Sequence, residues 1–472
     1  MKNTRYMMAQ FTFYDRTGIQ KMLEKKAQQG WMLEKIGSYA WKFRRIEPAK
    51  IHFAVTYFPK ASQFDPHPSE EQQRLWDFCE HTGWHLAASN AQLQIFYNKA
   101  ENPVPIETDP QIELENIHKT MNKSVIPSYI LLIVIGFLML LMNAMLMSGD
   151  VVHWLTSNAN LVTILCWSVI IIMMLIEITG YFIWHEKAWK SIQTDGSFIV
   201  TKGFRKVQLG LMWFVLGVVG VYLLTIEKRI AALSLISTVT VGIVTAVVFG
   251  VKNLLKKLDT PANINRVITI ITAVIMSFAI SGFGTVFIVY KAMQSGFLDT
   301  VQNNSYKYEH NGHTFTAYTD IIPLNIYDIV QTDTKEFSTR WDFESSVLVS
   351  EGRANQSPLA NNLGDWTLSY SVVEIKLPFL YNIVYKGMYK DFLGDPSLTV
   401  ATEAGHNAMT IDAEEWHADK AFRFVQDGYP TSRYLLCFDR HIVEIHFDQD
   451  MKIDQNVRDT VAQKLADIPV VK

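Results

Sequence analysis

The chain has 472 residues, of which 19% are charged and 49% hydrophobic, with a formal net charge of −3 and a sequence pI near 6.5. These averages exclude collagen-like, disordered and disulfide-scaffold proteins, which show excess Gly and Pro, too few hydrophobic residues or many cysteines. A pI near neutrality also argues against dedicated nucleic-acid binding, so we expect no nucleic-acid partner.

Residues 1–100 contain one pattern twice, and we predict that they form an α+β domain of ferredoxin-like type. Each copy reads as a strand, an amphipathic helix, a Gly-Trp pair and two more strands. The predicted elements are strand 11–14, helix 17–29 and strands 32–36 and 41–46, then strand 51–58, helix 70–82 and strands near 85–88 and 93–97. The pairs Gly30-Trp31 and Gly83-Trp84 lie 53 residues apart. Gly readily adopts the left-handed conformation that ends a helix. We expect both tryptophans to pack helix against sheet, with ligand binding as the alternative.

Residues 101–124 are predicted to link this domain to the first membrane span. Pro103, Pro105 and Pro110 favour extended backbone and disfavour a continuous rigid helix. Any signal would then pass through docking of domains on loops, and less through a shared helix.

Residues 125–290 contain five apolar stretches, each long enough for the roughly 20 helical residues that a bilayer crossing requires. They lack the polar stripe of a soluble amphipathic helix. We therefore predict a multi-pass α-helical membrane protein, with the lipid bilayer as a partner and spans at 125–147, 160–184, 207–226, 230–250 and 267–290.

Lys and Arg in the short loops predict the orientation. Loop 185–206 carries five of them and loop 251–266 carries four, whereas loop 148–159 carries none. We expect a cytoplasmic N-terminus and an extracytoplasmic C-terminus. The third and fourth spans could instead form a re-entrant pair, because the connection at 227–229 is short and basic.

Glu177 is the only acid inside a predicted span. Intramembrane carboxylates are costly and often functional. The alternatives are hydration near the interface and pairing with a loop lysine.

Residues 291–472 read as an acidic extracytoplasmic α+β domain, with 16 basic and 26 acidic residues against 16 and 14 in residues 1–124. We expect strands 313–318 and 366–376, helix 378–393, a hairpin of strands 434–438 and 441–447, and a terminal helix at 451–465. A net charge of −10 would attract a cationic envelope ligand.

The second hairpin strand carries the one weak metal-site candidate. Alternation places Glu444, His446 and Asp448 on one face, which we interpret as the solvated face of an edge hairpin. Zinc-ligand spacings, phosphate loops, dinucleotide fingerprints and nucleophile elbows are absent from the sequence. We therefore expect no metal, cofactor or catalytic residues.

Two groups of motifs resemble the domain-of-unknown-function family 2812 (DUF2812). The first group is Tyr14, Gly18-Ile19-Gln20-Lys21-Met22-Leu23-Glu24-Lys25 and Gln28-Gln29-Gly30-Trp31-Met32-Leu33; the second is Ile322-Pro323-Leu324, Tyr327-Asp328, Tyr381, Trp416 and Tyr434-Leu435-Leu436-Cys437. The resemblance implies a bacterial cell-membrane protein, mostly found in Gram-positive bacteria. It also implies that the gene lies beside a gene for a PadR-like transcriptional regulator. The family has no established enzymatic activity that the resemblance could imply.

The leading hypothesis is a sensor or accessory protein that couples an envelope signal to a cytoplasmic regulatory partner. A small-solute transporter or transporter subunit is the alternative, and an extracytoplasmic hydrolase is third.

Overall fold

The computed structural model of the chain describes residues 3–7, 11–37, 40–106, 109–195, 199, 205–225, 228–279, 304–330, 337–359, 366–394, 407–448, 451–467 and 469–470.

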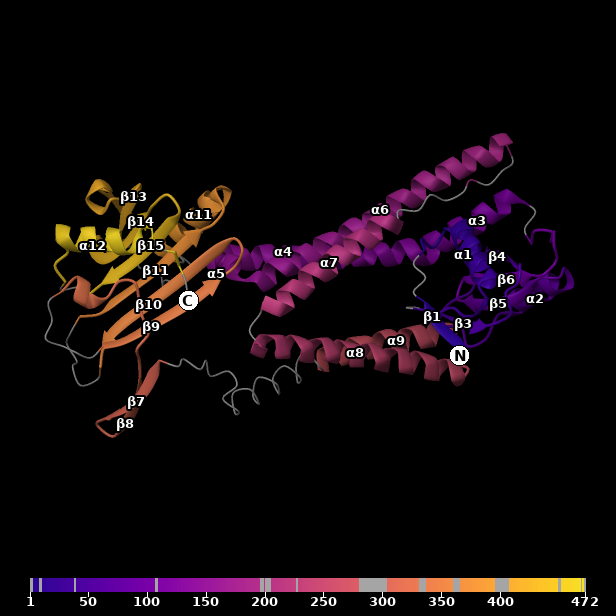
Figure 1. Cartoon of the computed structure of the whole chain (residues 1–472), viewed down its shortest axis with the longest axis horizontal. Coiled ribbons are helices and arrows are strands. Elements are labelled where there is room, and N and C mark those ends of the chain that lie inside the picture. Colours follow the sequence, from indigo (N-terminus) through magenta and orange to yellow (C-terminus); the bar gives the residue numbers. More distant parts are fainter. Residues whose placement is uncertain are drawn as a thin grey trace. The chain divides into compact units, whose positions relative to one another are not determined.

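The N-terminal domain consists of two strand-helix-strand-strand units (Figure 1). The first unit comprises β1 (Thr4–Met7), α1 (Arg16–Gln28), β2 (Trp31–Lys35) and β3 (Trp41–Arg45); the second comprises β4 (His52–Tyr57), α2 (Glu70–His81), β5 (His85–Asn90) and β6 (Leu93–Asn98). Their antiparallel sheets have the equivalent orders β1-β3-β2 and β4-β6-β5. The two units therefore share one topology but form separate sheets.

Local sequence explains where these helices begin and end. The Asp15 side chain accepts a hydrogen bond from the Gly18 amide, and Ser69 accepts one from Gln72. Gly30 and Gly83 follow the helices with φ of +80° and +83°, which confirms the predicted left-handed positions.

The strand predicted at 11–14 is wrong, because the first strand is β1, at Thr4–Met7. The Asp15 amide donates a 2.9 Å hydrogen bond to the Thr12 carbonyl, so the chain turns immediately before the cap of α1. Tyr14 is buried in the domain core, which accounts for the apolar character of this segment.

The prediction that the linker avoids a continuous helix holds for residues 101–106, which are not helical, but it is wrong from Pro110 onward. Helix α3 (Pro110–Thr120) passes through a π-helical turn, η1 (Met121–Val125), into α4 (Ile126–Gly149). Pro110 occupies the first turn, where its missing amide costs no hydrogen bond, and Asp109 caps the helix.

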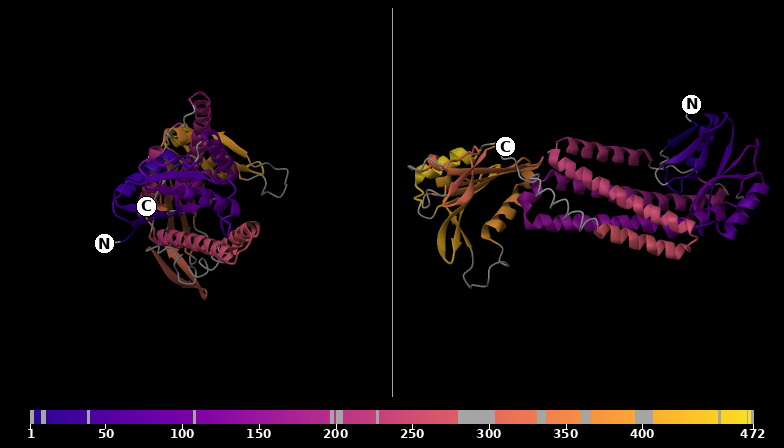
Figure 2. Two further views of the ribbon diagram at one scale, coloured as in Figure 1. Left: turned by 90° about the vertical axis from the view of Figure 1, so that its right-hand side faces the viewer. Right: turned by 90° about the horizontal axis from the view of Figure 1, so that it is seen from below.

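Among the described residues, five helices are long and apolar enough to cross a membrane. The first is the α3–α4 helix, and the others are α6 (Asn158–Asp195), α7 (Arg205–Thr225), α8 (Lys228–Lys257) and α9 (Ala262–Ala279). A short helix, α5 (Val151–Thr156), joins α4 to α6. Helices α8 and α9 run side by side (Figures 1 and 2). Residues 280–290 of the predicted fifth span lie outside the described residues.

The C-terminal region is a seven-stranded antiparallel sheet, in the order β12-β13-β14-β15-β11-β10-β9, together with a separate hairpin of β7 and β8. Its elements are β7 (Ser305–His310), β8 (His313–Tyr318), η3 (Ile326–Asp328), β9 (Phe337–Ser345), β10 (Val349–Pro358), β11 (Leu368–Ile375), η5 (Pro378–Leu380), α11 (Tyr381–Leu393), β12 (Asn407–Ile411), η6 (Glu414–Trp416), β13 (Lys420–Gln426), β14 (Tyr429–Cys437), β15 (His441–Phe447) and α12 (Gln455–Leu465). Side chains of α12 and η6 pack into one core cluster, and those of α5 and α11 pack into another.

The hairpin of β14 and β15 was predicted to lie at an edge of the sheet, and this prediction is wrong. Strand β15 pairs with β14 on one side and with β11 on the other, so it is central. Its partner β11 comes from a segment some 70 residues earlier, a distant pairing that local alternation does not reveal.

The chain divides into two compact units. Unit 1 comprises residues 1–138 and 166–298, and unit 2 comprises residues 139–165 and 299–472. The division falls inside α4 and inside α6, so each of these helices contributes to both units.

Candidate functional site

A cavity in unit 2, with a volume of about 910 Å³, lies against the seven-stranded sheet. Strands β9, β10, β11, β13, β14 and β15 contribute to its lining, together with helix α11 and the junction of α4 and α5. Its size falls within the range of small-molecule sites.

Cross-strand register brings polar side chains from four strands to this cavity. Glu444 of β15 lies opposite Ser371 of β11, which lies opposite Arg353 of β10. Residues directly opposite one another share a face of the sheet. A second row places Arg433, His446 and Ser369 side by side. These two rows supply six of the polar residues that line the cavity.

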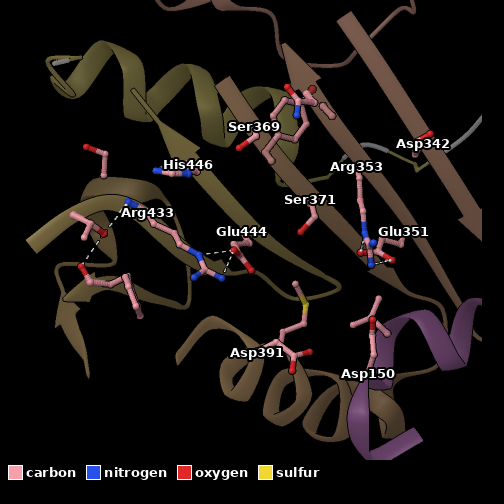
Figure 3. Close-up of a pocket in the computed structure, with 18 of the residues that line it drawn as sticks. Asp150, Asp342, Glu351, Arg353, Ser369, Ser371, Asp391, Arg433, Glu444 and His446 are labelled. Carbon is pink, nitrogen blue, oxygen red and sulfur yellow. Dashed lines mark hydrogen bonds and ion pairs between the residues drawn. The ribbon is translucent and has the colours of Figure 1, made fainter. Parts of the chain in front are cut away.

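Two ion pairs stand on either side of the serines (Figure 3). Arg433 contacts Glu444 at 2.6 Å, and Arg353 contacts Glu351 at 2.7 Å. The Glu351 side chain is buried, and this burial raises the pKa of its carboxyl even though Arg353 opposes the shift. Both arginines are therefore already neutralised by carboxylates of the sheet.

Two further carboxylates reach the cavity from helices, Asp150 at the start of α5 and Asp391 of α11 (Figure 3). Asp150 caps α5 by accepting a 2.9 Å hydrogen bond from the His153 amide. Within the described part of the chain, no ion pair or hydrogen bond engages the Asp391 carboxylate. Partial burial, and then the charge of Asp150, raises the pKa of Asp391.

The lining therefore carries more negative than positive charge. Its charged residues are Asp150, Asp342, Glu351, Asp391 and Glu444 against Arg353 and Arg433. A positively charged group placed between Asp150 and Asp391 would relieve their mutual repulsion.

The junction of α4 and α5 forms part of the cavity wall because α5 packs into the C-terminal domain. Val152, Trp154 and Leu155 are buried in one cluster with residues of β10, β11 and α11. His153 Nδ1 lies 2.9 Å from Glu344 Oε2, and the Asn158 amide donates to the Ser345 carbonyl. Asp150 is therefore held at the cavity by α5.

The three residues of the candidate metal site do not act as one group. Glu444 pairs with Arg433, His446 lines the cavity, and Asp448 accepts a 3.1 Å hydrogen bond from the Thr367 hydroxyl. No cluster of three potential ligands that could hold a metal ion occurs in the residues described above.

Glu177 lies in α6 and is 8% exposed. Its carboxylate accepts a hydrogen bond from the Gln208 amide of α7. Tyr14 and Tyr129 lie within electrostatic range of it. The hydrogen-bond partner of Glu177 is thus a side-chain amide from another candidate span, and not a lysine of a loop.

The two Gly-Trp pairs have different surroundings. Trp84 is buried with Phe96 and Cys79, and its indole donates a 2.8 Å hydrogen bond to the Val104 carbonyl. Trp31 is half-buried, with the guanidinium groups of Arg5 and Arg45 at 5.8 and 5.0 Å from its ring centroid.

Comparison with known proteins relates the N-terminal domain to one family. Residues 15–129 match the model of the family described as "Protein of unknown function (DUF2812)". The match runs from α1 into the first turn of α4, and the C-terminal motifs lie beyond it. No curated protein and no solved structure matches the chain. Residues 15–129 are therefore similar to the DUF2812 family, whose function is unknown.

Proposed function

We propose that this protein is a membrane sensor, in which a cationic ligand in the C-terminal cavity changes the state of the N-terminal domain through α4 and α6. The N-terminal domain would be cytoplasmic, of duplicated ferredoxin-like type, and would bind a regulatory partner. The C-terminal domain would face the cell envelope of a bacterium.

The observation that carries this proposal is that both soluble domains build their cores on the same two helices. In unit 1, Met121 of η1 and Tyr181 and Trp184 of α6 belong to the N-terminal core. Tyr14 contacts both aromatic rings of α6, with centroids 5.4 and 5.1 Å away. In unit 2, α5 joins the other ends of α4 and α6 and packs into the C-terminal core.

Contacts inside unit 1 support the proposed orientation. The loop between β4 and α2 meets the turn between α8 and α9, where His67 lies 2.7 Å from Asp259 and the Asn265 amide donates to the Phe64 carbonyl. The N-terminal domain thus contacts both the basic turn between α8 and α9 and the end of α6 that precedes the basic loop. Basic loops favour the cytoplasmic side.

We propose binding rather than catalysis at the cavity. Ser369 and His446 lie on adjacent strands, but no hydrogen bond between a cavity serine and His446 occurs in the described structure. A nucleophile activated by histidine requires such a contact.

A tethered cation tests the coupling. Asp391→Lys places an ammonium group in the cavity, and Asp439→Lys makes the same charge change at a side chain that is 98% exposed. We expect Asp391→Lys, in lipid nanodiscs, to alter amide hydrogen exchange severalfold in residues 114–121 and 181–192. Asp439→Lys should leave exchange there unchanged. Identical exchange in the two variants would refute the coupling.

The second candidate function is solute transport, favoured by the buried carboxylate of Glu177 inside a span. Glu177→Gln keeps the shape of the side chain and its contact with Gln208. If the protein is a transporter, reconstituted vesicles should show solute flux that this substitution abolishes. Flux that is absent, or unchanged by the substitution, removes the support for transport.

A further inference from the structure

We propose that the N-terminal domain has its own ligand site, a groove along the edge of β4 that binds a small organic amine. This site lies in unit 1 and is separate from the C-terminal cavity.

The groove is built from an open strand edge and a polar helix face. Strand β4 is the outer strand of its sheet. Helix α1 contributes Arg16, Gln20 and Glu24, which lie four residues apart and hence on one helical face. Residues 101–106 contribute to the opposite wall, and the enclosed volume is about 350 Å³. This volume is at the small end of the range for ligand sites.

Two buried polar atoms belong to side chains that line this groove and have no hydrogen-bond partner among the described residues. One is the hydroxyl of Thr56, a residue that is only 5% exposed, and the other is Nε2 of His52. Buried polar groups in proteins are nearly always hydrogen-bonded, so each such atom requires an explanation. A ligand in the groove would supply both missing partners.

The chemistry of the lining favours a ligand that donates hydrogen bonds. His52 Nδ1 lies 3.9 Å from a carboxylate oxygen of Glu24. We assign the ring proton to Nδ1 on the basis of this neighbour, so that Nε2 carries an unshared lone pair. The Thr56 hydroxyl can accept a hydrogen bond as well.

The charge of the lining favours a cation. Glu24, Glu101 and Glu113 line the groove, and the half-buried Arg16 neutralises the buried Glu113 through an ion pair. Glu24 and Glu101 have no lysine or arginine partner among the described residues. A protonated amine combines positive charge with several N–H donors, whereas a simple quaternary ammonium ion supplies charge without donors.

The groove also adjoins the helix that enters the membrane. Arg16 belongs to α1 and Glu113 to α3, and α3 continues through η1 into α4. An amine in the groove would therefore lie beside the ion pair that joins the domain to its membrane helix.

The test uses calorimetric titration of the full chain with spermidine, in nanodiscs of zwitterionic lipid so that lipid charge does not bind the probe. All variants carry Asp391→Lys, the tethered cation of the proposed function, so that the parent and the valine variants share one state of the C-terminal cavity and differ only at the threonine. Thr56→Val removes the groove hydroxyl and keeps the side-chain shape. Thr12→Val is the matched control, because Thr12 is 4% exposed, has an equally unpartnered hydroxyl and does not line the groove.

We expect saturable binding of spermidine and no binding of tetramethylammonium. Thr56→Val should weaken spermidine binding about tenfold or more, as expected for loss of a hydrogen bond to a charged group. Thr12→Val should leave the affinity unchanged, and both valine variants should melt at or above the parent temperature, since neither hydroxyl has a partner to lose.

Three results would overturn the proposal. The first is the absence of saturable spermidine binding. The second is an equal loss of affinity in Thr12→Val and Thr56→Val. The third is a lower melting temperature with unchanged affinity in Thr56→Val. That result would mean that the hydroxyl serves the Gln94 side-chain amide of the neighbouring strand, whose Nε2 also lacks a partner in the described residues.

Discussion

Gly136 of α4 is the position where a single added methyl group should disturb the pairing of α4 with α6. A Cβ at this position would lie 2.9 Å from Cγ1 and 3.1 Å from Cδ1 of Ile171, and 3.3 Å from the ring of Trp167. Ile is stiff at χ1 in a helix, so the backbones must separate to relieve the contact. Overpacking of this kind costs about 1–3 kcal/mol.

Helix propensity opposes this penalty, because Ala is favoured over Gly by about 1 kcal/mol. A double-mutant cycle of Gly136→Ala with Ile171→Ala cancels the propensity term and isolates the contact. We expect a coupling free energy of about 1–3 kcal/mol, measured by reversible unfolding in mixed micelles. Gly217→Ala in α7 is the control, because an added Cβ there meets nothing within 4 Å. A coupling below about 0.5 kcal/mol would refute the close packing of α4 on α6.

The remaining predictions concern the C-terminal domain. Because the pKa of Asp391 is raised above its ordinary 3.8, the folded protein holds this proton more tightly than the unfolded chain does. The contribution of Asp391 to the free energy of unfolding therefore falls as the pH rises from 3.8 through the pKa of the folded protein. The affinity of the cavity for a cation rises over the same pH range, because the carboxyl becomes charged. Calorimetric titrations across that window should show this rise, and Asp391→Asn should abolish it. Cys437 is fully buried and its pKa is raised to about 11 by burial. We expect iodoacetamide to modify it only as fast as the domain unfolds, and faster labelling in native buffer would contradict this burial.

Sequence patterns were enough to predict those elements whose structure depends on nearby residues. Gly30 and Gly83 mark the ends of two helices because few other residues adopt positive φ, and the apolar runs mark the membrane helices because a bilayer requires their length. The same reasoning failed at Pro110. Proline breaks a helix in its interior but is well tolerated in the first turn, and the deciding signal was the Asp109 cap beside it.

The C-terminal cavity could not be predicted, because its residues come from distant parts of the chain. Asp150 and Asp391 are more than 200 residues apart, and only the packing of α5 against α11 brings them together. Alternation in β15 did place Glu444 and His446 on one face. The sequence did not show that Ser369, Ser371 and Arg353 would continue that face, because strand register depends on distant pairing.

The π-helical turn η1 explains how one continuous helix meets two packing requirements. Before it, Leu114 and Ile117 of α3 lie in the N-terminal core. After it, Gly136 of α4 must face Ile171 of α6. A π turn adds about one residue to the helix, and each α-helical residue corresponds to a rotation of about 100°. The π turn therefore sets the rotation of α4 about the helix axis, relative to the face of α3 that packs into the N-terminal core. A change in how the N-terminal domain holds α3 would reach the membrane pair as a rotation of α4, without any break in the helix.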